Sequence, residues 1–236
     1  MKKTVLVFIL VGFAVSFAGN VCGQQAQTSP QTNQLQTEEW GDDFNGDKLD
    51  ATKWEKFTFE GGSGGKLEVK NGAVQIRSSN KTRAGIRSVK AFTNDRFLAE
   101  AHVAKVGAAY PEPGENNSTL GFAALTILFD GAGRNRIEWI LTSEGTLEAW
   151  ATRDGQGERL DNRKLGTKMK NPVLSVARRG DEFLFIINSP EAKPENAQIG
   201  LKSVVKNMPK SFHLMLYGYG SSENDWDSAR VITVKQ

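Results

Sequence analysis

The sequence predicts an all-β protein, a sandwich or barrel of antiparallel sheets with no helical layer. Three observations favour this class. Short stretches alternate apolar with polar residues, turn residues separate these stretches at regular intervals, and helical periodicity is nearly absent. Sheets without a covering helical layer must pack their apolar faces on each other, which favours two sheets. Only residues 191–206 have a pattern that allows a short turn of helix.

The expected strands follow one another in recognisable hairpins. In KLEVKNGAVQIRSS the pair Asn71-Gly72 favours a tight turn between two alternating stretches. The apolar run GFAALTILF (121–129) predicts a long buried strand. Further strands are expected in RIEWIL and TLEAWAT on either side of residues 143–145, in VLSVARRGDEFLFIIN with a turn at Gly180-Asp181, and in SFHLMLYGYG and ARVITVKQ.

The chain opens with a segment typical of a secretory signal peptide. Lys2 and Lys3 give a positive start, an apolar run extends over residues 4–18, and small residues follow. We expect cleavage after Gly23, with cleavage after Ala18 as the alternative. The apolar run is short for a membrane span, so we expect a secreted or periplasmic protein with no integral span in the mature chain.

Cys22 is the only cysteine, and it is expected to leave with the leader. A lipid anchor on Cys22 is not expected, because GNVC lacks a Leu-Ala-Gly-like triplet similar to a bacterial lipobox. The mature chain then has no thiol, which excludes disulfides, thiolate metal sites and cysteine nucleophiles. A secreted domain of this kind must be stabilised by burial alone, and about 200 residues suffice for that.

After the leader we expect two regions. Residues 24–38 are rich in Gln and Thr, which predicts a flexible tether, and residues 39–236 have a uniform composition that predicts one domain. The chain has 30 basic and 27 acidic residues, and two of the basic residues leave with the leader. The mature protein is therefore near neutral, which argues against nucleic acid as a partner. We expect a monomer.

Three segments resemble the concanavalin A-like lectin/glucanase superfamily. DDFNGDKLDATKWE (42–55) is similar to the N-terminal segment of family-16 glycoside hydrolases and their non-catalytic relatives. AGIRSVKAFTNDRFLAEAHVAKV (84–106) and NDWDSARVITVKQ (224–236) are similar to a strand pair and the closing strand of the same families, and LSVARRGDEFLFIINS is similar to a laminin-G-type hairpin. The resemblance covers residues 40–236 and implies a jelly-roll β-sandwich of two antiparallel sheets. It does not fix an activity, because one fold hosts many functions.

The resemblance also implies where a hydrolytic activity would lie. Family-16 enzymes carry Glu-x-Asp-x-(x)-Glu on one strand, and the alternate carboxylates face one glycosidic bond. The best match is RIEWIL, with Arg136 in place of the nucleophile, Glu138 at the helper position, and Ile140 or Leu141 in place of the acid. A guanidinium cannot form a glycosyl ester and leucine cannot donate a proton. We therefore do not expect the family-16 mechanism.

The same hairpin offers a candidate binding face. Period-two alternation places Ile137, Trp139 and Leu141 in the core, and the opposite face then presents Arg136, Glu138, Glu148 and Trp150. A pyranose ring can stack on an exposed indole while its hydroxyls bond to neighbouring charged groups. This predicts a carbohydrate-binding site. The alternative is a solvated face with an Arg–Glu pair across the strands and a tryptophan covered by a loop.

Other polar side chains extend the candidate list. Glu100 and His102 share a face of LAEAHVAKV, where they form either an acid–base couple or a structural hydrogen bond. Tyr110 lies in the long loop 107–121, which in the relatives rims the groove, so Tyr110 is a candidate second stacking residue. Four alternating residues near the C-terminus also share one face of their expected strand: His213, Met215, Tyr217 and Tyr219. They form either an aromatic platform or an apolar surface packed under a loop.

Metal binding is expected in one form only. No two histidines have metal-ligand spacing, so zinc and iron are not expected. The resemblance implies one structural Ca²⁺ held by Asp43, a carbonyl at Gly72 and Asp227, and oxygen ligands suit this ion. Alternatively, Asp227 caps its strand or pairs with Arg230.

Together these features indicate a secreted, non-catalytic carbohydrate-binding protein of a bacterial envelope, with a polysaccharide or oligosaccharide as partner. Two alternatives stay open. One is a glycoside hydrolase or polysaccharide lyase with a different carboxylate set, for example Glu100, His102 and Glu138. The other is a structural envelope domain without a ligand.

Overall fold

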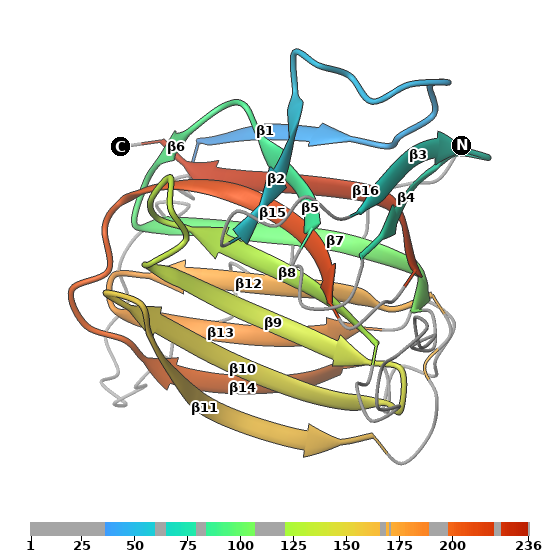
Figure 1. Ribbon diagram of the computed structural model, residues 1–236. Coiled ribbons are helices and arrows are strands. Elements are labelled where there is room, and N and C mark those ends of the chain that lie inside the picture. Colours follow the sequence, from blue (N-terminus) through green and yellow to red (C-terminus); the bar gives the residue numbers. More distant parts are fainter. Residues whose placement is uncertain are drawn as a thin grey trace, which may run out of the picture. The chain divides into compact units, whose positions relative to one another are not determined.

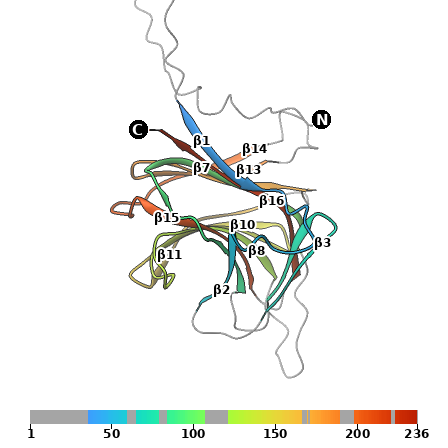
Figure 2. The same ribbon diagram turned by 90° about the horizontal axis from the view of Figure 1, so that it is seen from above.

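Two antiparallel sheets pack on each other across an apolar core (Figures 1 and 2). The computed structural model describes residues 36–59, 65–78, 84–106, 121–165, 169, 171–188, 198–219 and 223–235. The expected all-β sandwich is confirmed, and no described residue is helical apart from a single 3₁₀ position at Phe59. In the described part of the chain, no helix is long and apolar enough to cross a membrane.

The first sheet has the order β14-β13-β12-β7-β16-β4-β3, with β1 beside β16. Its long central strands, β7 and β16, lie next to each other (Figure 1). The bounds of its strands are β1 Thr37–Asp42, β3 Lys66–Lys70, β4 Ala73–Arg77, β7 Arg96–Val106, β12 Val173–Arg179, β13 Glu182–Asn188, β14 Gln198–Val204 and β16 Glu223–Val234.

The second sheet has the order β11-β10-β9-β8-β15-β5-β2, with β6 beside β15. Strand β11 is therefore the edge of this sheet, and β8 to β11 form a continuous antiparallel series (Figure 1). The bounds of its strands are β2 Trp54–Thr58, β5 Ala84–Ser88, β6 Phe92–Thr93, β8 Phe122–Leu128, β9 Arg136–Thr142, β10 Thr146–Arg153, β11 Gln156–Lys164 and β15 Ser211–Tyr219.

The hairpin turns follow the turn chemistry of the sequence. Asn71 and Gly72 have φ values of 55° and 73°, the two positive values that a tight primed turn requires. The pair Gly180-Asp181 connects β12 to β13, as expected. Asp154 and Gly155, with φ values of 50° and 86°, make a similar turn between β10 and β11.

The core lies where the period-two alternation predicts. Ile137, Trp139 and Leu141 of β9 are buried in the main core together with Leu147 and Ala149 of β10. The buried indole of Trp139 donates its Nε1–H to the carbonyl oxygen of Ile186 in the first sheet, at 2.8 Å. A fully buried N–H needs such a partner, so this bond ties the two sheets together.

Two features differ from the expectations or refine them. Residues 198–204 form strand β14 instead of a short helical turn, because they pair with β13 along its whole length; residues 191–197 lie outside the described residues. Strand β1 begins at Thr37, within the last two residues of the expected tether. Residues 1–35 lie outside the described part, so the leader and the rest of the tether stay predictions.

One carboxylate in the first sheet is poorly accommodated. Asp225 of β16 has a buried Oδ1 that accepts no hydrogen bond from any described residue. Burial raises its pKa above the ordinary aspartate value, and Glu223 acts in the same direction, while Lys105 and a hydrogen bond from Gln75 oppose them. The ionised form is therefore disfavoured in the folded protein relative to the unfolded chain.

Replacing this carboxylate by an amide should stabilise the fold at neutral pH. Because the folded pKa lies above the unfolded one, the native state carries an ionisation cost at pH 7 that disappears as the pH falls through the folded pKa. We expect Asp225→Asn to raise the midpoint of thermal unfolding at pH 7, and the difference from the parent protein to shrink in acid. Asp47→Asn, at an exposed position, is the matched control. Equal midpoints for Asp225→Asn and the parent at pH 7 would contradict this assignment.

Candidate functional site

A groove of about 400 Å³ lies on the face of the second sheet that is turned away from the main core. Its floor belongs to a second apolar cluster, separate from the core between the sheets. This cluster is built from buried side chains of β8, β9 and β15 together with aromatic side chains near the groove: Phe57, Phe59, Phe122, Ala124, Leu128, Ile140, Trp150, Met215 and Tyr217.

The four hairpin residues expected on one face all line this groove: Arg136, Glu138, Glu148 and Trp150. The strand register explains why. Glu138 of β9 lies opposite Trp150 of β10, and Ile140 lies opposite Glu148. Side chains directly opposite each other in an antiparallel pair share a face, so two short sequence patterns produce one continuous polar and aromatic surface.

Glu138 is buried, although a position on the outward face of a strand suggests a solvated carboxylate. Its side chain is only 5% exposed. Oε1 accepts a hydrogen bond from the Tyr217 hydroxyl, and Oε2 lies 3.0 Å from Nε of Arg136. Both oxygens of this carboxylate therefore have partners within the protein, and the charge is neutralised by the guanidinium.

Arg136 is held on its other side by an aromatic ring and a turn. Its guanidinium lies 5.0 Å from the ring centre of Phe59, and Nη1 donates to the carbonyl oxygen of Gly133. Gly133 has a φ of 75°, and a Cβ at this position would lie 2.2 Å from the Phe59 ring. Only glycine fits there, so the turn before β9 can close onto Phe59 and fix Arg136.

Trp150 and Glu148 form the second half of the groove. The indole Nε1–H of Trp150 donates to Oε2 of Glu148 at 2.8 Å, and Trp150 stays partly exposed. On the neighbouring strand β11, the guanidinium of Arg159 lies 5.9 Å from the indole centre. Gly157 of β11 also lines the groove, and it leaves space beside the indole.

Glu100 and His102 do not join this site. Both lie on β7 of the first sheet, where they line a different groove of about 520 Å³. Glu100 is buried and accepts hydrogen bonds from Ser175 at 3.0 Å and from Arg230 at 2.6 Å. Sequence alternation shows which face of its own strand a residue occupies but not which sheet the strand joins. The alternative catalytic set of Glu100, His102 and Glu138 is therefore divided between two sheets.

The ring of His102 bridges two segments of the first sheet. Nδ1 lies 2.6 Å from Oδ1 of Asp227, and Nε2 lies 2.9 Å from the carbonyl oxygen of Asn171. Of the other C-terminal candidates, Met215 and Tyr217 belong to the apolar cluster of the groove, whereas Nδ1 of His213 lies 2.7 Å from the carbonyl oxygen of Ser88. Tyr110 and the side chain of Tyr219 lie outside the described residues.

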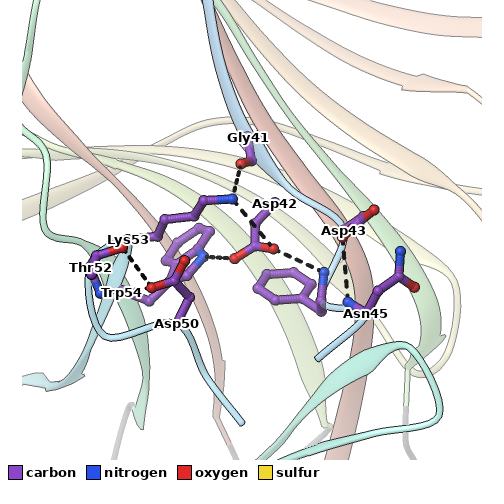
Figure 3. Close-up of polar contacts among 9 residues, drawn as sticks. Gly41, Asp42, Asp43, Asn45, Asp50, Thr52, Lys53 and Trp54 are labelled. Atoms are coloured by element: carbon purple, nitrogen blue, oxygen red, sulfur yellow. Dashed lines mark hydrogen bonds and ion pairs between the residues drawn. The ribbon is translucent and has the colours of Figure 1, made fainter. Parts of the chain in front are cut away.

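The three residues expected to hold calcium make other contacts in this structure, and the calcium site stays a prediction. Asp227 directs Oδ1 toward His102 and Ser228. Asp43 accepts a hydrogen bond from the backbone N–H of Asn45 (Figure 3), and Gly72 forms the turn between β3 and β4. Among the described residues, no group of three His, Cys, Asp or Glu side chains lies close enough together to hold a metal ion.

Asp42, the residue next to the expected calcium ligand Asp43, has a structural role. Asp42 accepts hydrogen bonds from the backbone N–H of Phe44 at 3.1 Å and from Nε1 of Trp54 at 2.9 Å (Figure 3). Lys53 donates to the carbonyl oxygen of Gly41 at 2.9 Å. These bonds fix the segment between β1 and β2 over the core, where Phe44 and Trp54 are buried.

Sequence reasoning missed several residues of the groove. Tyr217 was assigned to an aromatic face, but its bond to Glu138 joins residues 79 positions apart. Phe59, Gly133 and Arg134 come from a strand end and a turn, which alternation does not describe. The one available signal was the turn sequence DGAGRN directly before β9, whose glycines and arginine adjoin the predicted face.

No family model matches the sequence, and no curated protein matches it. Solved structures do resemble the fold. A β-glucanase of Bacillus licheniformis has a TM-score of 0.59 at 9% identity, over 84% of this chain and 98% of that one. The CBM2 module of the evolved Dit protein of Lactobacillus casei BL23 phage J-1 has a TM-score of 0.58 at 11% identity, over 86% and 98%.

A third similar structure is the exoplasmic/lumenal domain of VIP36 in its Ca²⁺/Man3GlcNAc-bound form. Its TM-score is 0.53 at 10% identity, over 78% of this chain and 86% of that one. At these identities the likenesses show the fold alone. They confirm the concanavalin A-like jelly roll that the sequence resemblance implied, a fold used by glucanases and by lectins.

The buried ion pair beneath the groove gives a stability prediction. Arg136→Met keeps apolar contact with Phe59 but leaves Glu138 as a buried carboxylate without a counter-charge. We expect a loss of about 3 kcal/mol in the free energy of unfolding, measured by chemical denaturation, because an unpaired buried charge is costly. The double variant Arg136→Met/Glu138→Leu should recover most of this loss.

Arg153→Met is the matched control, because Arg153 pairs with Glu158 at the surface with side chains 51% and 63% exposed. An exposed pair contributes little, about 0–1 kcal/mol. If Arg136→Met cost no more than Arg153→Met, the Arg136–Glu138 pair would not be the buried interaction described here.

Proposed function

We propose that this protein binds a carbohydrate in the groove of the second sheet and does not cleave it. The observation that carries the proposal is the partly exposed indole of Trp150, held in place by Glu148 and surrounded by polar side chains and glycines. The shared fold supports it, since one similar structure holds a mannose-containing glycan and another is a glucanase. We also propose that the chain is exported and works in the cell envelope, on the strength of its leader-like residues 1–23.

The groove offers both kinds of contact that a sugar requires. The flat apolar face of a pyranose can stack on the Trp150 indole, whose orientation is fixed by its hydrogen bond to Glu148. A side chain that is already oriented loses little conformational entropy on binding. Sugar hydroxyls can then donate to Glu148 and accept from Arg134, which also lines the groove.

The same contacts argue against hydrolysis. A glycosidase of either stereochemistry requires one carboxylic acid that protonates the leaving group. Glu138 lies against the Arg136 guanidinium, and Glu148 accepts the Trp150 N–H. The contacting oxygens of both residues thus accept from donors of the protein itself, so neither residue is arranged as a proton donor.

A second candidate function is hydrolysis by Glu138 and Glu148 as a pair. The observation in its favour is that both carboxylates line one groove at diagonal positions of the β9–β10 pair. The Cα atoms of diagonal neighbours are about 7–8 Å apart, so two glutamate side chains there can reach the separation of about 6.5–9.5 Å found between the carboxyl groups of inverting enzymes. This function requires one of the two carboxyls to become protonated when substrate binds.

Removing the indole should weaken recognition strongly. We expect one or more glycans of a soluble polysaccharide panel to retard the protein in affinity electrophoresis. Trp150→Ala should weaken that interaction by at least about tenfold, because truncating a central aromatic contact usually costs more than 1.4 kcal/mol. Trp150→Phe, which keeps an aromatic face, should retain part of the affinity.

The same glycan, incubated with the parent protein, decides between the two functions. An unchanged chain length in chromatography agrees with binding alone. Release of reducing ends that is lost in both Glu138→Gln and Glu148→Gln would overturn the non-catalytic assignment. If no glycan of the panel retards the protein, the carbohydrate proposal fails for that panel.

A further inference from the structure

We infer that the ligand of this groove is an anionic saccharide, with carboxylate or sulfate groups recognised by Arg134 and Arg159. This inference rests on the proposed carbohydrate-binding function and names its ligand class. It follows from the distribution of charge around the groove and from the absence of side chains at the glycines between the two arginines.

The first observation is that these two arginines have no counter-charge. Neighbouring cations are paired: Arg136 with Glu138, Arg153 with Glu158, and Arg87 with Glu55. In the part of the chain that the structure describes, no carboxylate lies within ion-pair distance of Arg134 or Arg159. Toward the described residues, the Arg134 side chain donates one hydrogen bond, from Nη2 to the carbonyl oxygen of Asp154 at 3.2 Å.

The carboxylates nearest to the groove do not cancel this charge. Glu138 is neutralised by Arg136. Asp130 accepts hydrogen bonds from the backbone N–H groups of Ala132, Arg134 and Asn135 and from the Asn135 side chain, so its oxygens are directed into its own turn. Glu148 is the one carboxylate lining the groove that has no cationic partner among the described residues. Its single negative charge is smaller than the combined positive charge of the two unpaired guanidinium groups.

The second observation is that the stretch of chain leading to Arg159 contributes two glycines to the groove. Gly155 and Gly157 lie there, and both line the groove. Gly155 is required by its turn, where φ is 86°. Gly157 is different: its φ is not positive, and an added Cβ would make only ordinary contacts, 3.7 Å from Thr152 Oγ1 and 3.9 Å from Trp150 Cε3.

The fold therefore does not require glycine at residue 157. Glycine in the interior of a strand weakens it and often marks a place where a ligand approaches the backbone closely. Here the missing side chain leaves the edge of the Trp150 indole accessible from β11, between Arg134 and Arg159. A sugar ring stacked on Trp150 could extend a charged substituent toward either arginine through this opening.

The chemistry of the two arginines selects the class of substituent. A guanidinium presents N–H donors in a planar fork that matches the oxygen pairs of a carboxylate or a sulfate, and such bonds are stronger than bonds between neutral groups. Neutral sugars offer hydroxyl, ether and amide groups but no anionic pair of oxygens. The groove should therefore prefer uronate-containing or sulfated chains to neutral ones of similar length.

The test compares the purified protein on neutral and anionic polysaccharides by affinity electrophoresis at about 0.15 M salt, where long-range attraction is screened. The panel contains a neutral β-glucan and a neutral galactan, polygalacturonate and alginate as carboxylate polymers, and carrageenan as a sulfated polymer. We expect retardation by at least one anionic polymer. Arg134→Gln and Arg159→Gln should each weaken it several-fold, and the double variant by about tenfold or more.

Two further variants complete the design. Gly157→Val should block the opening and reduce binding while leaving the thermal midpoint unchanged or higher, because a β-branched residue suits a strand. Arg163→Gln is the matched control. It removes the same charge from the same strand, at a position opposite core residue Leu147 and thus on the other face.

The outcomes separate the inference from the proposed function. Binding to the carboxylate polymers alone or to the sulfated polymer alone supports the inference and identifies the charged group. Binding to neutral glycans that Trp150→Ala abolishes and the arginine variants leave unchanged overturns the inference and keeps the proposed function. An equal loss in Arg163→Gln shows attraction by charge in general, which also overturns it. If no polymer of the panel binds, both the inference and the proposed function fail for that panel.

Discussion

The structure depends on the orientation of strand β9, which one buried hydrogen bond fixes. Trp139 Nε1 donates to the Ile186 carbonyl oxygen in the opposite sheet, so its indole must face the core. With Trp139 inward, Glu138 and Ile140 are outward by the geometry of a strand. A shift of one residue would bury the carboxylate between the sheets and leave the indole N–H unpaired. The groove therefore exists because the core accepts this tryptophan in one register only.

How far the site follows from the sequence depends on how local each contact is. Alternation and a short loop place Arg136, Glu138, Glu148 and Trp150 on one face, and the structure has them there. The Tyr217–Glu138 bond depends on β15 lying next to β8, a matter of strand order that no local pattern contains. For the same reason Glu100 was expected in the site but lies outside it: its strand β7 belongs to the other sheet.

The N-terminal segment is held by side-chain contacts that the resemblance did not imply. DDFNGDKLDATKWE suggested a calcium ligand at Asp43, yet the carboxylate with the most contacts is its neighbour. Asp42 joins the backbone N–H of Phe44 and the indole of Trp54, and Lys53 reaches the carbonyl oxygen of Gly41 (Figure 3). Hydrogen bonds and an ammonium group thus hold this segment together, and a calcium ion at Asp43 stays a prediction.

Strand β11 has a consequence for the state of the protein in solution. It ends its sheet, and all of its side chains except the half-buried Leu160 are exposed. An unpaired edge of this length is a template on which another chain can add a strand, and charged side chains are the usual protection against it. Five of its nine residues are charged, in both signs: Glu158, Arg159, Asp161, Arg163 and Lys164. Gln156 and Asn162 are polar. Strand β11 thus has two roles: its charged side chains protect the edge of the sheet against self-assembly, and its Gly157 lines the groove.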